Sequence, residues 1–184
     1  MSRSCRIVLP STLVLIALSM VGGARPSQSA GRGTITLTVD AVEAPRKIFH
    51  IHLVIPAEPG PLSLSYPKWI PGEHGPTGPV TDVAGLHISA EGESLPWERD
   101  LEDMYAVHFT VPALARSVQV DFDFISAASP EGFSSAASAT ERITLLSWNQ
   151  VLLYPSGEPS DALTYTASLR LPTKRQTPSA LHAR

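Results

Sequence analysis

Short runs of alternating apolar and polar side chains recur along this chain and are separated by turn-forming residues. Between residues 33 and 41, Ile35, Leu37 and Val39 alternate with threonines, the period-two pattern of a half-buried strand. Similar runs span residues 46–55, 62–66, 82–90, 95–99, 105–111, 118–124 and 163–171. The run at residues 46–55 is apolar enough to be a central strand, and Gly92 in the EGES segment suits a tight hairpin turn. Residues 143–154 contain two apolar runs that we expect to be buried. No window keeps a helical period. Strands that recur about every ten residues predict an all-β fold, an antiparallel β-sandwich-like single domain.

Length and composition narrow the class of protein further. The 184 residues suffice for one domain of ordinary size. Hydrophobic residues make up 43% and charged residues 17% of the chain, and the formal net charge is −3. This composition excludes a disordered chain and a basic nucleic-acid-binding protein.

The N-terminal segment has the layout of a secretory signal peptide. Two arginines precede an apolar run over residues 7–21, and small residues follow it. The run is short for a membrane span and is interrupted by Pro10. We expect residues 1–24 to be the signal, with cleavage after Ala24 or as late as Ala30, and the protein to be exported to the periplasm or the medium. An uncleaved membrane anchor is the alternative.

Removal of this segment would also remove the only cysteine, Cys5. A disulfide framework and a thiolate metal site are therefore not expected in the mature chain. Residues 31–171 are predicted to form the β-rich domain. Within it, residues 126–140 are a low-complexity stretch that predicts a mobile surface loop, and residues 172–184 form a polar tail that we expect to be disordered.

Residues 66–80, YPKWIPGEHGPTGPV, contain four prolines and three glycines. Such a stretch is neither a helix nor a central strand, and its prolines predict a stiff, shaped loop. Large amphipathic side chains on a stiff loop are typical of recognition surfaces. The candidate recognition residues of this loop are Tyr66, Lys68, Trp69, Glu73 and His74. The alternative is structural, with Trp69 and Ile70 closing the end of the sandwich.

Catalytic motifs are missing from the sequence. His50 and His52 lie two residues apart on a predicted strand and so share a face, but a zinc site needs a further ligand that the sequence does not identify. A pair of exposed histidines is the commoner outcome. No His-Glu-x-x-His, Gly-x-Ser-x-Gly or cysteine nucleophile is present. The acidic run WERDLEDMY, residues 97–105, could supply paired carboxylates for glycoside hydrolysis, but a solvated turn is favoured.

Three segments resemble the N-terminal domain of the glycyl-aminopeptidase family of zinc metallopeptidases, peptidase family sixty-one. They are YPKWIPGEHGPTGPV at residues 66–80, PWERDLEDMYAVHF at residues 96–109 and LSWNQVLLYP at residues 146–155. The resemblance extends from about residue 33 to about residue 171. It implies a β-rich domain that precedes a helical catalytic domain, which carries the zinc site and the general base. No residue of this sequence matches those downstream ligands.

The resemblance implies a non-catalytic N-terminal β-domain that packs on a catalytic domain and shapes its substrate cleft. The last of the three segments adds Trp148, Asn149 and Gln150 to the candidate interface residues. No cofactor is expected in this chain, and its partners would be a catalytic domain and a peptide substrate. Because the tail departs from the family after LRLP, a truncated or frameshifted product is favoured over an independent domain. The alternative function is a secreted carbohydrate- or peptide-binding module that uses Tyr66 and Trp69 as a stacking platform.

Overall fold

The structure is a computed structural model that describes residues 33–126, 137–140 and 142–172. Its strands are β1 (Thr34–Asp40), β2 (Ile48–Pro56), β3 (Gly60–Ser65), β4 (Val83–Ala90), β5 (Glu93–Ser94), β6 (Trp97–Arg99), β7 (Ala106–Val111), β8 (Ser117–Ile125), β9 (Ser138–Ala139), β10 (Thr144–Leu145), β11 (Tyr154–Pro155) and β12 (Thr164–Arg170). Short 3₁₀ turns occupy Ala44–Arg46, Val80–Asp82, Trp148–Gln150 and Ser160–Ala162. The described chain is all-β, as the alternation predicts.

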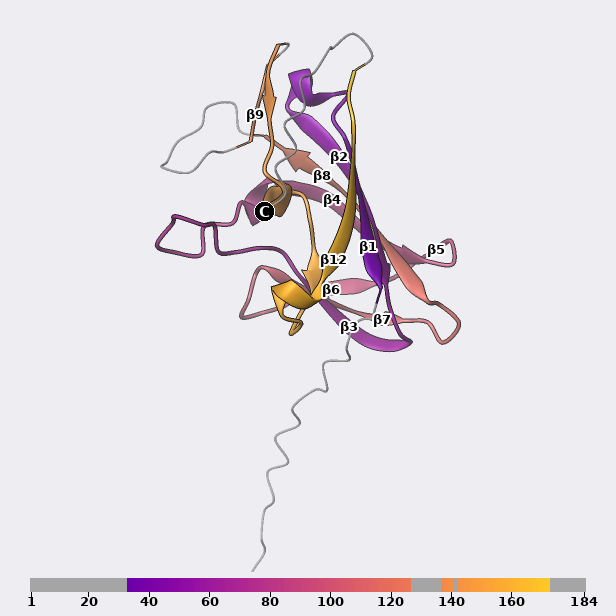
Figure 1. The fold of residues 1–184 in the computed structure, drawn as a ribbon. Helices are drawn as coiled ribbons and strands as arrows, with labels where there is room; N and C mark the ends of the chain where they lie inside the picture. Colours follow the sequence, from indigo (N-terminus) through magenta and orange to yellow (C-terminus); the bar gives the residue numbers. More distant parts are fainter. Residues whose placement is uncertain (1–32, 127–136, 141, 173–184) are drawn as a thin grey trace, which may run out of the picture.

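Two larger sheets form the domain (Figure 1). The first has six strands in the order β12-β1-β2-β8-β4-β5, and the second has four in the order β11-β3-β7-β6. The strands β9 and β10 make a separate two-stranded ribbon. All the pairings are antiparallel except that of β12 with β1, which is parallel. The predicted sandwich-like arrangement is confirmed.

The core lies between the inward faces of the two larger sheets. In β2, Phe49, Ile51, Leu53 and Ile55 are buried while His50 and His52 on the opposite face are exposed. This strand lies between β1 and β8, the central place that its apolar content predicts. Alternation therefore decided both the strand and its inward face here.

Two other local predictions have opposite outcomes. The turn between β4 and β5 contains Glu91 (φ 51°) and Gly92 (φ 83°), and two successive positive φ angles are typical of a two-residue hairpin turn. The apolar run at residues 143–146 was expected to be buried, and this expectation is wrong for its first part. Ile143 is 63% exposed, and it directly precedes β10 in a ribbon that is separate from the two larger sheets (Figure 1).

The predicted signal peptide and most of the predicted mobile loop and polar tail lie outside the described residues. Among the residues that the structure does describe, no helix is long and apolar enough to cross a membrane.

Candidate functional site: the clamped loop and its pocket

Residues 66–80 leave the end of β3 and project from the side of the domain (Figure 1). Tyr66 begins the segment and is only 2% exposed. Its phenol O–H donates to the carbonyl of Gln150 at 2.7 Å, and its backbone N–H donates to the carbonyl of Tyr105 at 2.8 Å. Burial raises the pKa of the Tyr66 phenol, so the group stays a neutral donor. Tyr66 is thus an anchor, and its ring is not available for the predicted stacking platform.

Gly78 closes the loop near the point where it began. Its N–H donates to the carbonyl of Lys68 at 2.9 Å. A Cβ at this position would lie 2.0 Å from the carbonyl oxygen of Pro67 and 2.8 Å from the Cα of Lys68. The two ends of the loop are therefore in backbone contact at its base, at a distance that only glycine permits.

A second loop, between β6 and β7, holds the first one from the side. Lys68 Nζ lies 2.6 Å from Asp103 Oδ2 and 6.0 Å from the centre of the Tyr105 ring. The hydrogen bond between Lys68 and Asp103 is the main cause of the raised pKa of Lys68 and of the lowered pKa of Asp103. The O–H of Tyr105 donates to the carbonyl of Pro76 at 2.7 Å. These contacts fix the middle and the far side of the Pro/Gly loop.

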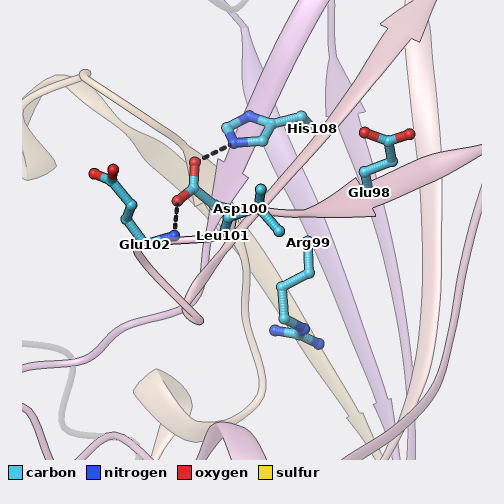
Figure 2. A pocket seen from close by; sticks show the side chains of 6 residues that line it. All are labelled: Glu98, Arg99, Asp100, Leu101, Glu102 and His108. Carbon is cyan, nitrogen blue, oxygen red and sulfur yellow. Dashed lines mark hydrogen bonds and ion pairs between the residues drawn. The ribbon is translucent and has the colours of Figure 1, made fainter.

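Asp100 organises the second loop (Figure 2). Its Oδ1 accepts the backbone N–H groups of Glu102 and Asp103 at 2.8 Å, and its Oδ2 lies 2.7 Å from His108 Nε2. These bonds, above all the one from the Asp103 N–H, lower the pKa of Asp100 to about 2. The other nitrogen of His108, Nδ1, lies 2.7 Å from Ser63 Oγ on β3.

A pocket of about 290 Å³ adjoins this network. The residues that line it are Glu98, Arg99, Asp100, Leu101, Glu102 and His108 (Figure 2). The acidic run was expected to be a solvated turn or a pair of catalytic carboxylates. It is an ordered turn, since Asp100 and Asp103 bind backbone amides and basic side chains.

The chain Ser63–His108–Asp100 has the residue types of a nucleophilic triad, but its setting is different. Ser63 lies in the middle of β3, paired with His108 across the sheet, and its carbonyl accepts the N–H of Ser156. A serine nucleophile needs an exposed position beside N–H groups that are free to bind an oxyanion, such as a sharp turn between strand and helix. The geometry therefore suits a connection between loop and sheet, which fixes the Asp100 turn on β3 and β7.

The tip of the loop, defined as residues 69–77 between the two ends of the bond from Gly78 to Lys68, is largely open to solvent. Trp69 is 62% exposed, so the alternative that it closes the end of the sandwich is wrong. His74 is exposed and Glu73 is half-buried. Two more exposed apolar side chains, Leu101 and Met104, come from the neighbouring loop. The tip therefore presents an exposed aromatic ring and polar side chains on a loop whose backbone is held at its base.

Trp148, Asn149 and Gln150 lie on the 3₁₀ turn that receives the Tyr66 hydroxyl. Gln150 is buried, and its side chain forms a capping box with Ser147. Trp148 packs against the core and Asn149 is half-exposed. Of this predicted group, Gln150 contacts the loop, since its carbonyl accepts the Tyr66 hydroxyl. The structure thus brings together two residues that lie 84 positions apart.

The strand histidines are on the outer face of the six-stranded sheet, remote in the topology from the loop. His50 Nδ1 lies 2.6 Å from Asp123 and His52 Nδ1 lies 2.7 Å from Asp121, both on β8. Within the described parts of the chain, no group of three or more histidine, cysteine or acidic side chains is arranged to hold a metal ion. The predicted shared face is confirmed, and each histidine is engaged by a carboxylate.

The sequence interpretation missed Asp100, Asp103, Tyr105 and His108 as parts of the site. The one available signal was the WERDLEDMY run itself. An aspartate side chain that accepts backbone N–H groups two and three residues further on, as Asp100 does, is a common turn pattern. Its pairing with His108, in contrast, depends on the register of β6 and β7.

The structure defines an all-β, sandwich-like domain with a Pro/Gly loop held at its base. A family model described as the Peptidase M61 N-terminal domain matches residues 36–184. The chain therefore belongs to the Peptidase M61 N-terminal domain family, as the three sequence segments indicate. A comparison with curated protein sequences finds no significant match.

One solved structure shares this fold, and a second gives a weaker match. An aminopeptidase N family protein from Idiomarina loihiensis superposes with a TM-score of 0.63 at 18% identity, over 76% of this chain and 22% of that protein. An M1 zinc metallopeptidase from Deinococcus radiodurans matches with a TM-score of 0.33 at 18% identity, over 75% of this chain and 30% of that protein. The chain thus spans less than a third of either relative.

Proposed function

We propose that this domain packs on the catalytic domain of an exported glycyl-aminopeptidase-like metallopeptidase and shapes its substrate cleft through the tip of the Pro/Gly loop. The domain itself is non-catalytic in this proposal, and zinc belongs to the catalytic partner. The observation that carries the proposal is Trp69, which is 62% exposed on a loop fixed by backbone and side-chain contacts.

A rigid loop favours recognition because little conformational entropy is lost when it binds. Tryptophan is also enriched among the residues that dominate binding energy at protein interfaces. The tip has both features, and the loop between β6 and β7, which contacts the Pro/Gly loop, exposes two further apolar side chains, Leu101 and Met104. These properties support docking against another folded surface, whereas a core position for Trp69 would have argued against it.

The test is docking to a separately expressed, zinc-loaded catalytic domain from a complete relative in the same family. Calorimetric titration should show binding by the wild-type domain and a loss of affinity of about 30-fold or more for Trp69→Ala, as for a hot-spot residue. Leu114→Ala is the matched control because Leu114 is 86% exposed but follows β7 at the end away from Tyr105. Equal binding by wild type and Trp69→Ala would refute the role of the tip, and no binding at all would refute the proposal.

A further inference from the structure

The edge strand β12 differs from every other edge of the two larger sheets. At the opposite edge of its own sheet, β5 has two residues. In the second sheet, the edge strands are β11, with two residues of which one is Pro155, and β6, with three residues including Glu98 and Arg99. Short, charged or proline-containing edges are the usual protection against pairing with another chain. The domain protects three edges in this way.

In contrast, β12 has seven residues, TYTASLR, and pairs with β1 along its full length without a register shift. It contains no proline and no lysine, and its one charge, Arg170, is paired with Asp40 of the same chain. Six of its seven residues are exposed, and in the described part of the chain no strand pairs with its outer side. A long, straight and unprotected edge is a template for another strand.

The direction of its backbone groups follows from one hydrogen bond. The carbonyl of Arg170 accepts the N–H of Ala41 at 2.8 Å, so Arg170 points its backbone groups toward β1. Because these groups alternate in direction along a strand, Ser168, Thr166 and Thr164 do the same. The backbone N–H and C=O groups of Tyr165, Ala167 and Leu169 therefore point to the open side.

The sequence of β12 is self-complementary in an antiparallel pairing centred on Ala167. Tyr165 of one copy then lies opposite Leu169 of the other, and Ala167 lies opposite its own equivalent. All three are residues with outward backbone groups, so each pair is a hydrogen-bonded pair. Arg170 lies opposite Thr164, so like charges do not meet.

The same register joins apolar surface. Tyr165, Ala167 and Leu169 are the partners of Ile35, Leu37 and Val39 in β1 and so lie on the inward face of the sheet. The four-stranded sheet does not cover them fully, since Leu169 is 44% exposed. An antiparallel partner would place the Tyr165 ring of one copy beside Leu169 of the other and extend the apolar face across the two-fold axis.

We propose that β12 is a dimerisation edge, at which two copies of this chain pair antiparallel about Ala167 to form one continuous sheet of twelve strands. Two six-stranded sheets contribute equally, and the two-fold symmetry closes the assembly at the dimer. Growth beyond two copies is limited because the remaining edge of each sheet, β5, has two residues.

Sedimentation equilibrium of the full chain should show a species of twice the 19.7 kDa chain mass that dissociates on dilution. Hydrogen exchange identifies the surface. Protection of the amides of Tyr165, Ala167 and Leu169 should rise with protein concentration, whereas the amides of Thr166 and Ser168 face β1 and should be protected at every concentration. A monomer at all concentrations, a larger open assembly, or a dimer in which the three outward amides exchange freely would overturn the proposal.

Two substitutions complete the test. Ala167→Pro removes an outward N–H that pairs with no strand among the described residues, and should weaken the dimer about tenfold or more through the two equivalent bonds lost. Leu169→Lys puts a charge on the joined apolar face and should weaken the dimer without changing the backbone. This variant keeps the test valid if Ala167→Pro folds poorly. Leu101→Lys changes an exposed leucine away from this edge and should leave the dimer intact. Equal effects of Leu169→Lys and Leu101→Lys would refute the edge as the interface.

Discussion

The base and the tip of the Pro/Gly loop have similar amino-acid composition but opposite environments. At the base, Tyr66 and Gly78 are buried and hydrogen-bonded to distant parts of the chain. At the tip, Trp69 and His74 are exposed. The difference shows that the loop obtains its shape from the base, so the tip needs no burial of its own to keep a defined position. Substitutions at the base should therefore affect stability, and substitutions at the tip should affect binding.

Among substitutions within the loop, the largest effect is expected for Gly78→Ala. The new Cβ would overlap the backbone of Pro67 and Lys68, which cannot move away as a flexible side chain could. We expect the free energy of unfolding to fall by about 3 kcal/mol, at the upper end of the usual cost of overpacking. Urea denaturation measures it.

Gly75→Ala is the matched control, because the nearest atom to its new Cβ would be Thr77 Cγ2 at 3.9 Å. Similar costs for both substitutions would show that the base is not closed as described.

Tyr66→Phe should have the next largest effect. The substitution keeps the ring but removes the hydroxyl that donates to the buried carbonyl of Gln150. Leaving a buried acceptor unpaired costs about 1–2 kcal/mol in free energy of unfolding. Tyr105→Phe removes a comparable bond, to Pro76, at an exposed site and should cost less. Thermal and urea unfolding of the two variants should rank them in this order, and the reverse order would contradict the assignment of Tyr66 as the anchor.

Acid should weaken the hydrogen bonds by which Asp100 orders the loop between β6 and β7. The pKa of Asp100 is lowered to about 2 in the folded domain, and that of an unfolded aspartate is about 3.9. A carboxyl group whose pKa is lower in the folded state than in the unfolded state stabilises the fold at pH values above its unfolded pKa. This contribution is lost as the pH falls from about 4 to about 2. The stability difference between wild type and Asp100→Ala should accordingly narrow over this range. A stability difference that stays constant from about pH 5 to about pH 2 would show that the ionised carboxylate of Asp100 does not stabilise the fold.

Trp69→Ala should have the smallest effect on stability. Trp69 is exposed and lies outside the described core cluster, and substitutions at such surface sites change the free energy of unfolding by about 0.5 kcal/mol or less. Leu64→Ala, a fully buried residue of β3, is the contrast and should cost about 2–5 kcal/mol. If Trp69→Ala approached that cost, the tip would be part of the core, and the comparison of base and tip would fail.

Alternation in the sequence predicted the strands well but predicted their burial only in part. The strands β2 and β12 carry the same period-two pattern, yet the apolar residues of β2 are buried and Leu169 of β12 is not. A side chain's face follows from the local backbone, whereas its burial depends on whether another sheet covers that face. The same reason explains why Ile143 was expected in the core and is exposed.

By itself, the sequence determined the all-β class, the central place of β2, the hairpin turn at Gly92 and the loop at residues 66–80, because each depends on side-chain period or on the backbone limits of proline and glycine. Only the tertiary structure decided that Tyr66 is an anchor, that Trp69 is exposed and that Asp100 joins His108. The bond from Tyr66 to Gln150 joins residues 84 positions apart, and the ion pair of Lys68 with Asp103 spans 35 positions. Such contacts depend on sheet order and register, which local pattern does not specify.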